Sequence, residues 1–258
     1  MIDSHCHLDV AAFDADRDDV LARARAAGVT GILVPAIRPR TWDALARLAR
    51  ERRAIVRAAF GVHPQIVPEL EPDELADLEQ RIARACEDHG AIAVGECGLD
   101  GGTAQRELQQ QIFRAHVRAA RALAKPLVVH VLHAHDVAPQ LLREERAGDV
   151  GGVMHSYSGG GELVPVYRDL GFAFSFAGPV TYPNARRPLE AARAVPAELL
   201  LAETDAPDQA PASHRGGRSE PAYLPEIIAG LAAARDEPTA AVAARTAENA
   251  RRVFRDFP

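Results

Sequence analysis

The sequence has few of the features that mark disulfide-rich, exported or membrane-spanning proteins. Its cysteines are Cys6, Cys86 and Cys97, and no two of them form a Cys-x-x-Cys pair. Such an odd, scattered set argues against a disulfide framework and favours a reducing cytoplasm. No apolar run reaches the roughly 20 residues that cross a bilayer. Polar motifs follow Met1 so closely that a signal peptide is not expected. We therefore expect a cytoplasmic protein that has no membrane partner.

Positive charge is scarce as well. The formal net charge is −6 at pH 7, the pI is near 5.9, and Lys125 is the single lysine. A protein that binds duplex nucleic acid through its overall field is usually basic. If this chain acts on a phosphate polymer, metal ions and a few local arginines must therefore capture the polymer.

Short β-rich runs alternate with longer amphipathic runs along the whole chain. The predicted strands are residues 2–5, 30–35, 55–61, 91–95, 127–131, 152–155, 173–176 and 199–203. The predicted helices are residues 16–27, 42–53, 73–88, 104–124, 138–146, 162–170, 184–193, 223–235 and 238–255. This alternation predicts parallel strands in an α/β fold. We expect one (β/α)8 TIM-type barrel domain over residues 1–258, with an extra C-terminal helix. An open doubly wound sheet is the alternative, but no G-x-G-x-x-G follows the first strand.

The first candidate ligands are the two histidines of a His-x-His motif, His5 and His7. Side chains alternate faces along an extended strand, so these two imidazoles share one face. Two imidazoles on one face at a strand end are able to bind one metal ion. The alternative is a pair of surface or helix-capping histidines.

Further polar residues of ligand type fall at the ends of other predicted strands. They are His63, Glu96, His130, His155 and Asp205. Each alone is compatible with a structural role. Active sites of α/β barrels lie at the carboxyl ends of the strands, so all of these side chains are expected to meet at one rim. Desolvated imidazoles and carboxylates need partners, and a metal site would supply them.

The number of candidate ligands favours two ions over one. The four histidines His5, His7, His130 and His155 and the two carboxylates exceed what one tetrahedral zinc needs. Two ions about 3.5–4 Å apart, bridged by a carboxylate and a water, would use all of them. Glu96 ends a central predicted strand and is the natural bridging residue.

Several ordered segments resemble the TatD family of metal-dependent deoxyribonucleases, which belongs to the amidohydrolase-like barrels. The matching segments are residues 3–9, 61–64, 95–100, 126–130, 155–159 and 203–207. The resemblance covers essentially the whole chain. It implies a site for two divalent ions, which in this family are usually magnesium, manganese or zinc.

The resemblance also implies roles for individual residues. In that assignment one ion is held by His5, His7 and Asp205, the second by His130 and His155, and Glu96 joins the two. Glu203 would lie behind the ligands or touch a bound water. His63 would face the scissile phosphate; the alternative is a capping or core histidine beside Pro64. Catalysis would then depend on Asp205, Glu96 and His63.

One departure from the family concerns phosphate binding. The family often has an arginine two residues after the histidine of strand five, where this chain has Leu132. His133 and His135 are candidates to replace it, and the alternative, which we favour, is that they are ordinary loop histidines. Arg186 and Arg187 are other candidates for phosphate contacts, with solvated surface charge as the alternative.

Three functions follow from these residues. The first is a deoxyribonuclease that binds DNA transiently and hydrolyses phosphodiester bonds of single strands or ends with a metal-activated water. The second keeps the metals but acts on a small-molecule ester, lactone or amide, which the missing arginine and the acidic pI favour. The third is a barrel that binds metal or ligand without catalysis.

Overall fold

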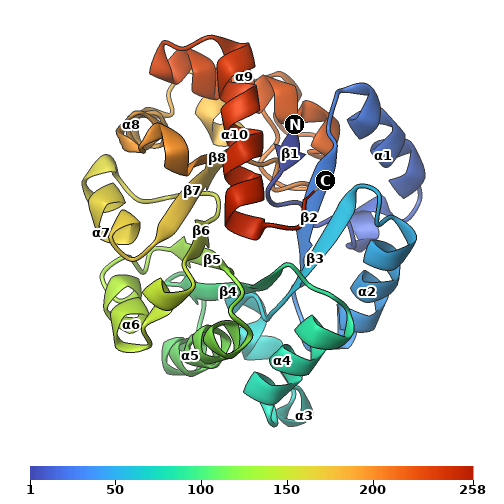
Figure 1. Ribbon diagram of the computed structural model, residues 1–258, viewed down its shortest axis with the longest axis vertical. Helices are drawn as coiled ribbons and strands as arrows, with labels where there is room; N and C mark the ends of the chain where they lie inside the picture. Colours follow the sequence, from blue (N-terminus) through green and yellow to red (C-terminus); the bar gives the residue numbers. More distant parts are fainter. Residues whose placement is uncertain (258) are drawn as a thin grey trace.

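Eight parallel strands form one sheet in sequential order in the computed structural model, which describes residues 1–257 (Figure 1). They are β1 (Ile2–Asp3), β2 (Gly31–Pro35), β3 (Val56–Phe60), β4 (Ala93–Asp100), β5 (Leu127–Leu132), β6 (Gly152–Met154), β7 (Phe172–Phe176) and β8 (Leu200–Ala202). The sheet closes between β8 and β1, where the amide of Ser4 donates to the carbonyl of Ala202 at 3.2 Å. Sequential order and closure confirm the (β/α)8 barrel and exclude the doubly wound alternative.

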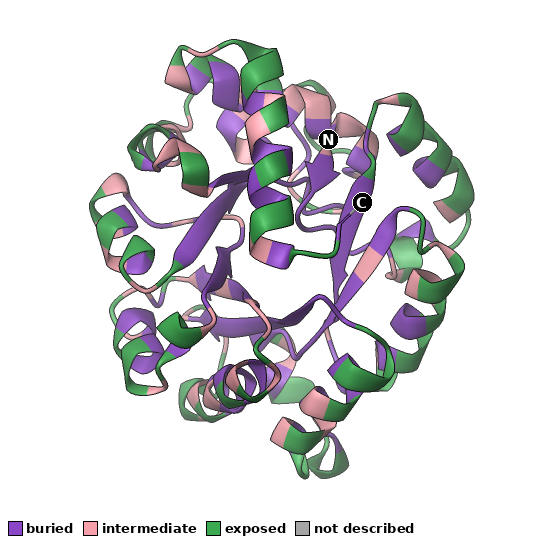
Figure 2. Cartoon of the chain, in the orientation of Figure 1, coloured by how far each residue is buried: buried purple, intermediate pink, exposed green. Residues whose placement is uncertain are grey.

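Helices surround the sheet (Figure 1). They are α1 (Arg17–Ala26), α2 (Trp42–Glu51), α3 (Pro72–Leu75), α4 (Leu78–Asp88), α5 (Arg106–Leu123), α6 (Ala138–Glu144), α7 (Val164–Arg168), α8 (Arg186–Ala194), α9 (Leu224–Arg235) and α10 (Thr239–Phe254). Most strand residues are buried, and the outer helix faces are exposed (Figure 2). No helix in the described part of the chain combines the length and the apolar character that spanning a membrane requires.

The extra C-terminal helix closes one end of the barrel. Ala250 and Phe254 of α10 pack with Ile2, Val128 and Leu201, which are buried residues of three strands. The side chain of Asn249 donates to the carbonyls of Ala197 and Leu200, each at 2.8 Å. These contacts lie at the amino ends of the strands, so the opposite mouth, where the strands end, remains for a site.

Two predicted elements differ from the structure. The helix predicted over residues 73–88 is in fact two helices, because Ala76 is extended and Asp77 takes a left-handed conformation with φ 49° between α3 and α4. The fourth strand does not end at residue 95 but continues to Asp100. Glycines are common in turns, but Gly98 lies within the strand. It allows β4 and β5 to pack closely, because a Cβ at this position would lie 1.9 Å from the carbonyl oxygen of His130 on β5.

Candidate metal centre

Asp3, at the end of β1, ties together the two segments that carry the first ligands. Its carboxylate accepts hydrogen bonds from the amide of His5 at 3.3 Å and the amide of Thr204 at 2.9 Å. The hydroxyl of Thr204 donates to the same carboxylate at 2.6 Å. Burial raises the pKa of Asp3 to about 8, against these hydrogen bonds. Asp3 therefore fixes the position of the loop after β1 relative to the loop that leads to Asp205.

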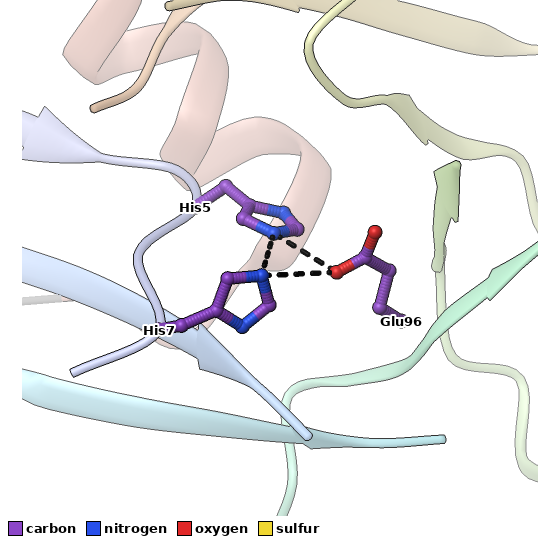
Figure 3. A group of neighbouring side chains, drawn as sticks. All are labelled: His5, His7 and Glu96. Atoms are coloured by element: carbon purple, nitrogen blue, oxygen red, sulfur yellow. Dashed lines mark hydrogen bonds and ion pairs between the residues drawn. The ribbon is translucent and has the colours of Figure 1, made fainter. Parts of the chain in front are cut away.

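The first group of candidate ligands consists of His5, His7, Glu96 and Asp205. The Nε2 atoms of His5 and His7 lie 3.2 Å apart, and Glu96 Oε2 lies 3.1 Å and 3.3 Å from them (Figure 3). Asp205 Oδ1 lies 3.6 Å and 3.8 Å from the same two nitrogens. Ligands that surround zinc tetrahedrally at 2.0–2.1 Å stand about 3.3 Å apart. The four atoms thus have the spacing of a ligand set.

The second group lies around the other oxygen of Glu96. Glu96 Oε1 is 2.7 Å from His155 Nε2, 3.1 Å from His130 Nδ1 and 2.9 Å from His63 Nε2. His130 Nδ1 and His155 Nε2 are 3.1 Å apart. The two oxygens of one fully buried carboxylate therefore face two separate sets of imidazoles, as a bridging residue would.

In three of the imidazoles, the far nitrogen, which is the ring nitrogen that points away from Glu96, faces an oxygen atom of the protein. His7 Nδ1 lies 3.3 Å from the carbonyl oxygen of Pro35. His155 Nδ1 lies 3.5 Å from Glu203 Oε1, and His130 Nε2 lies 3.6 Å from Asp100 Oδ2. An oxygen on this side favours the proton on the far nitrogen and leaves the lone pair of the near nitrogen directed at the centre.

His63 is oriented in the opposite sense. Its Nδ1 accepts a hydrogen bond from the amide of Gln65 at 3.1 Å. The proton of the neutral ring therefore lies on Nε2, which points at Glu96. Burial lowers the pKa of His63, which favours this neutral form. The structure places His63 within the centre as a hydrogen-bond donor.

The carboxylates Glu203 and Asp205 differ in their surroundings. Glu203 Oε1 accepts from the amide of Ser156 and Oε2 from the hydroxyl of Ser175, so it lies behind His155 with its oxygens occupied. Asp205 has Oδ1 directed at the first group, and its Oδ2 accepts from the side-chain amide of Gln209.

Burial and mutual charge shift the titration of these groups. Burial opposes ionisation of Glu96, but the surrounding imidazoles, His155 foremost, outweigh it and hold the pKa of Glu96 well below the usual range. Burial raises the pKa of Asp205 to about 6, against the charges of His155 and His7. Burial opposes the charge on His7, yet Glu96 and Asp205 raise its pKa to about 9. In the protein alone, protons on imidazoles thus offset the negative charge of the carboxylates. A bound divalent cation would offset the same charge.

Unpartnered buried atoms support the fit of cations to this centre. Glu96 Oε2 is buried and makes no hydrogen bond, although nitrogens surround it. The groups His5–His7–Glu96 and His63–Glu96–His130 each bring three ligand-type atoms within 4.8 Å of one another. An unsatisfied buried carboxylate oxygen is costly, and a bound cation would remove that cost.

The sequence interpretation missed two positioning residues. Asp100, four residues after Glu96 on the same strand, is held by the side chain of Gln65 at 2.7 Å. The even spacing from Glu96 along the strand was the available signal. Gln209 comes from the loop after β8, and no local pattern indicates its contact with Asp205.

The other phosphate candidates lie outside the centre. The ring nitrogens of His135 are occupied: Nδ1 lies 2.8 Å from the hydroxyl of Tyr167, and Nε2 lies 3.1 Å from Ser158 Oγ. His133, Arg186 and Arg187 are exposed. His135 is thus a structural loop residue, as the sequence interpretation favoured.

Comparison with known proteins identifies relatives over the full length. The family model "TatD related DNase" matches residues 2–255. The chain is 36% identical over 259 residues to the uncharacterized metal-dependent hydrolase YcfH of Escherichia coli, covering 98% of this chain and 95% of that protein. It is 32% identical over 258 residues to the uncharacterized metal-dependent hydrolase YabD of Bacillus subtilis, covering 99% of each. The crystal structure of the TatD homologue YjjV from Escherichia coli superposes with a TM-score of 0.91 at 29% identity, covering 99% of this chain and 98% of that chain.

Proposed function

The chain belongs to the TatD family of metal-dependent hydrolases, and from this premise we propose that it is a deoxyribonuclease that uses two divalent cations. The observation that supports two ions most directly is the position of Glu96. Its Oε2 lies beside His5 and His7, and its Oε1 lies beside His155, His130 and His63. One carboxylate between two imidazole groups is the arrangement of a bridged pair of cations.

In this proposal His5, His7, Glu96 and Asp205 would hold the first cation. Glu96, His130 and His155 would hold the second. Mixed imidazole and carboxylate ligands suit zinc or manganese on grounds of ligand softness, and magnesium remains a candidate from the family. Bound cations would lower the pKa of a coordinated water toward about 7 and offset the charge of a phosphodiester.

The protein's own side chains would then handle the proton and the developing charge. Asp205 would accept the proton of the attacking water, while Gln209 holds Oδ2 and so keeps the carboxylate in place. His63 donates its Nε2–H to a phosphoryl oxygen, because Nδ1 is already occupied by the amide of Gln65. One such donor contributes roughly 3 kcal/mol to transition-state binding.

The proposed DNA substrate is a single strand or a strand end. The ligand atoms lie at a buried mouth: the exposed fractions of His7 and Asp205 are 8% each. Bases within an intact duplex stay stacked and would have to leave the helix to reach such a mouth. The three free cysteines are all buried, which supports action in a reducing compartment such as the cytoplasm.

A second candidate is hydrolysis of a small-molecule ester, lactone or amide at the same centre. The observation that favours it is a mostly apolar pocket beside His130 and His155, with Leu132 in its wall. Such a wall suits an uncharged group better than a chain of phosphates.

The nuclease proposal is tested with purified protein, manganese or magnesium, and end-labelled single-stranded DNA. We expect cleavage by the wild-type protein, none with chelator present, and a loss of at least about a hundredfold in Glu96→Gln, which keeps the shape but removes the bridging charge. Glu162→Gln, an exposed glutamate, is the matched control and should cleave like wild type. Equal, slow cleavage by wild type and Glu96→Gln would refute the assignment.

A further inference from the structure

A pocket of about 310 Å³ opens beside the second ligand group. His130 and His155 are at its inner edge. Its walls come from the ends of β5 and β7, the segment after β6, the 3₁₀ turn Gly178–Thr181, α8 and, through Gln209, the loop after β8. The apolar wall residues include Leu132, Tyr157, Phe176, Val180 and Pro188. None of the lining residues found among residues 1–257 is Lys, Arg, Asp or Glu.

Tyr157 makes the wall rigid as well as apolar. Its ring packs edge-on against Phe174 at 4.9 Å and Phe176 at 6.2 Å between centroids. Its hydroxyl donates to the carbonyl of Gly160 at 3.0 Å and is therefore engaged away from a ligand. A buried, interlocked ring of this kind presents a fixed surface rather than a mobile loop.

The polar groups next to the wall already have partners. The hydroxyl of Ser158 donates to the carbonyl of Val131 at 2.7 Å, so it accepts from His135 Nε2 at 3.1 Å. Arg187 is exposed and does not line the pocket. Burial raises the pKa of Tyr157, and the charge of Arg187 opposes this only in part. Away from its inner edge, the pocket would strip a phosphate of its hydration and offer it no charged side chain in return, whereas an uncharged ring would lose little.

We propose that this pocket binds an uncharged ring of the substrate, either a nucleobase or an aryl group, next to the bond that is hydrolysed at the metal centre. The inference rests on the proposed function in one respect, namely that the reacting group is held at the Glu96 centre. The apolar wall would then select for the ring while the ligand groups hold the charged or polar part.

The test compares two anions on the manganese-loaded protein by titration calorimetry. Methylphosphonate and phenylphosphonate carry the same metal-binding group and differ in the ring. We expect phenylphosphonate to bind wild type at least about tenfold more tightly, because the ring leaves water on entering the pocket. Equal affinities in wild type would overturn the proposal.

Variants locate the effect in the pocket. Leu132→Trp fills the space and Leu132→Ala removes part of the wall, so both should reduce the advantage of the phenyl group to about threefold or less while methylphosphonate binds as in wild type. Leu189→Trp makes the same exchange at another half-buried leucine, outside the pocket lining, and should keep the full advantage. A phenyl advantage that persists unchanged in both Leu132 variants would overturn the proposal.

Abasic substitutions distinguish the source of the ring. Single-stranded DNA with an abasic site on one side of the scissile bond should be cleaved about tenfold more slowly at that bond if the ring is a nucleobase. If abasic sites have no effect while the phenyl advantage is present, the ring is an aryl group of a smaller ester. Because affinity is read without turnover, a protein that shows the phenyl advantage but cleaves no DNA refutes the nuclease proposal and retains the pocket.

Discussion

Asp100 Oδ2 lies 3.6 Å from His130 Nε2, on the side of the imidazole away from Glu96. A side-chain hydrogen bond from Gln65 and an amide hydrogen bond from Gly102 hold this carboxylate in place. The pKa of Asp100 is well below its usual range, with the His130 side chain as the largest cause, so the carboxylate is ionised. This pair resembles the carboxylate–histidine arrangement that orients ligands in metal sites and raises their basicity.

Asp100→Asn should therefore weaken binding of the second ion by about 10- to 100-fold without removing a ligand. Competition with a fluorescent chelator measures the affinity. Asp88→Asn, an exposed aspartate at the end of α4, is the matched control. Wild-type affinity in Asp100→Asn would show that this carboxylate does not position His130.

Gln209 should matter for turnover rather than for metal content. Its side-chain amide donates to Asp205 Oδ2, and a hydrogen bond to an ionised group is worth about 1.5–3 kcal/mol. Gln209→Ala should lower kcat about tenfold or more in the DNA assay, with the bound ions unchanged by elemental analysis. Gln140→Ala, the same substitution at an exposed glutamine, is the control. Loss of a bound ion from Gln209→Ala would contradict this prediction and show that Gln209 supports metal binding.

His116 should make stability depend on pH. Burial lowers its pKa to about 4, against a hydrogen bond to the carbonyl of Ile112, and its Nε2 accepts from the amide of Val62 at 2.9 Å. Between pH 6.5 and 4 the unfolded chain binds a proton that the folded chain does not. The free energy of unfolding should thus fall as pH falls through this window, by up to about 1.4 kcal/mol per unit from this group.

His116→Gln keeps an acceptor for Val62 but does not titrate. Urea unfolding at pH 6.5 and pH 5 should show a loss in wild type about 2 kcal/mol larger than in the variant. Other buried histidines contribute equally to both proteins and cancel in the comparison. Parallel pH profiles for the two proteins would contradict the account of His116.

The closing helix should contribute to stability through Phe254. Its side chain is 1% exposed and packs edge-on against Phe257 at 5.9 Å between centroids. Phe254→Ala should lower the free energy of unfolding by about 3–5 kcal/mol, as removal of a buried aromatic ring usually does. Val253→Ala, at a partly buried neighbour, should cost clearly less. Similar losses for the two variants would show that α10 does not plug the barrel.

The barrel was predictable because its signal repeats along the chain. Each β-rich run is followed by an amphipathic run, and ligand-type residues recur where the runs change. The extension of β4 was not predictable, because Gly95 and Gly98 are typical of turns unless the neighbouring strand is known. The contact between Gln209 and Asp205 depends on how the loop after β8 folds back, which has no periodic pattern. The orientation of His63 likewise depends on one backbone amide, that of Gln65.

The central claim is that Glu96 joins two cations, and metal stoichiometry tests it most directly. Wild-type protein should be saturated with manganese or zinc, freed of excess metal by gel filtration, and measured by elemental analysis. The account predicts two ions per chain in wild type, and one or fewer in Glu96→Ala with the barrel still folded by circular dichroism. A single ion in wild type, or two ions retained by Glu96→Ala, would contradict it.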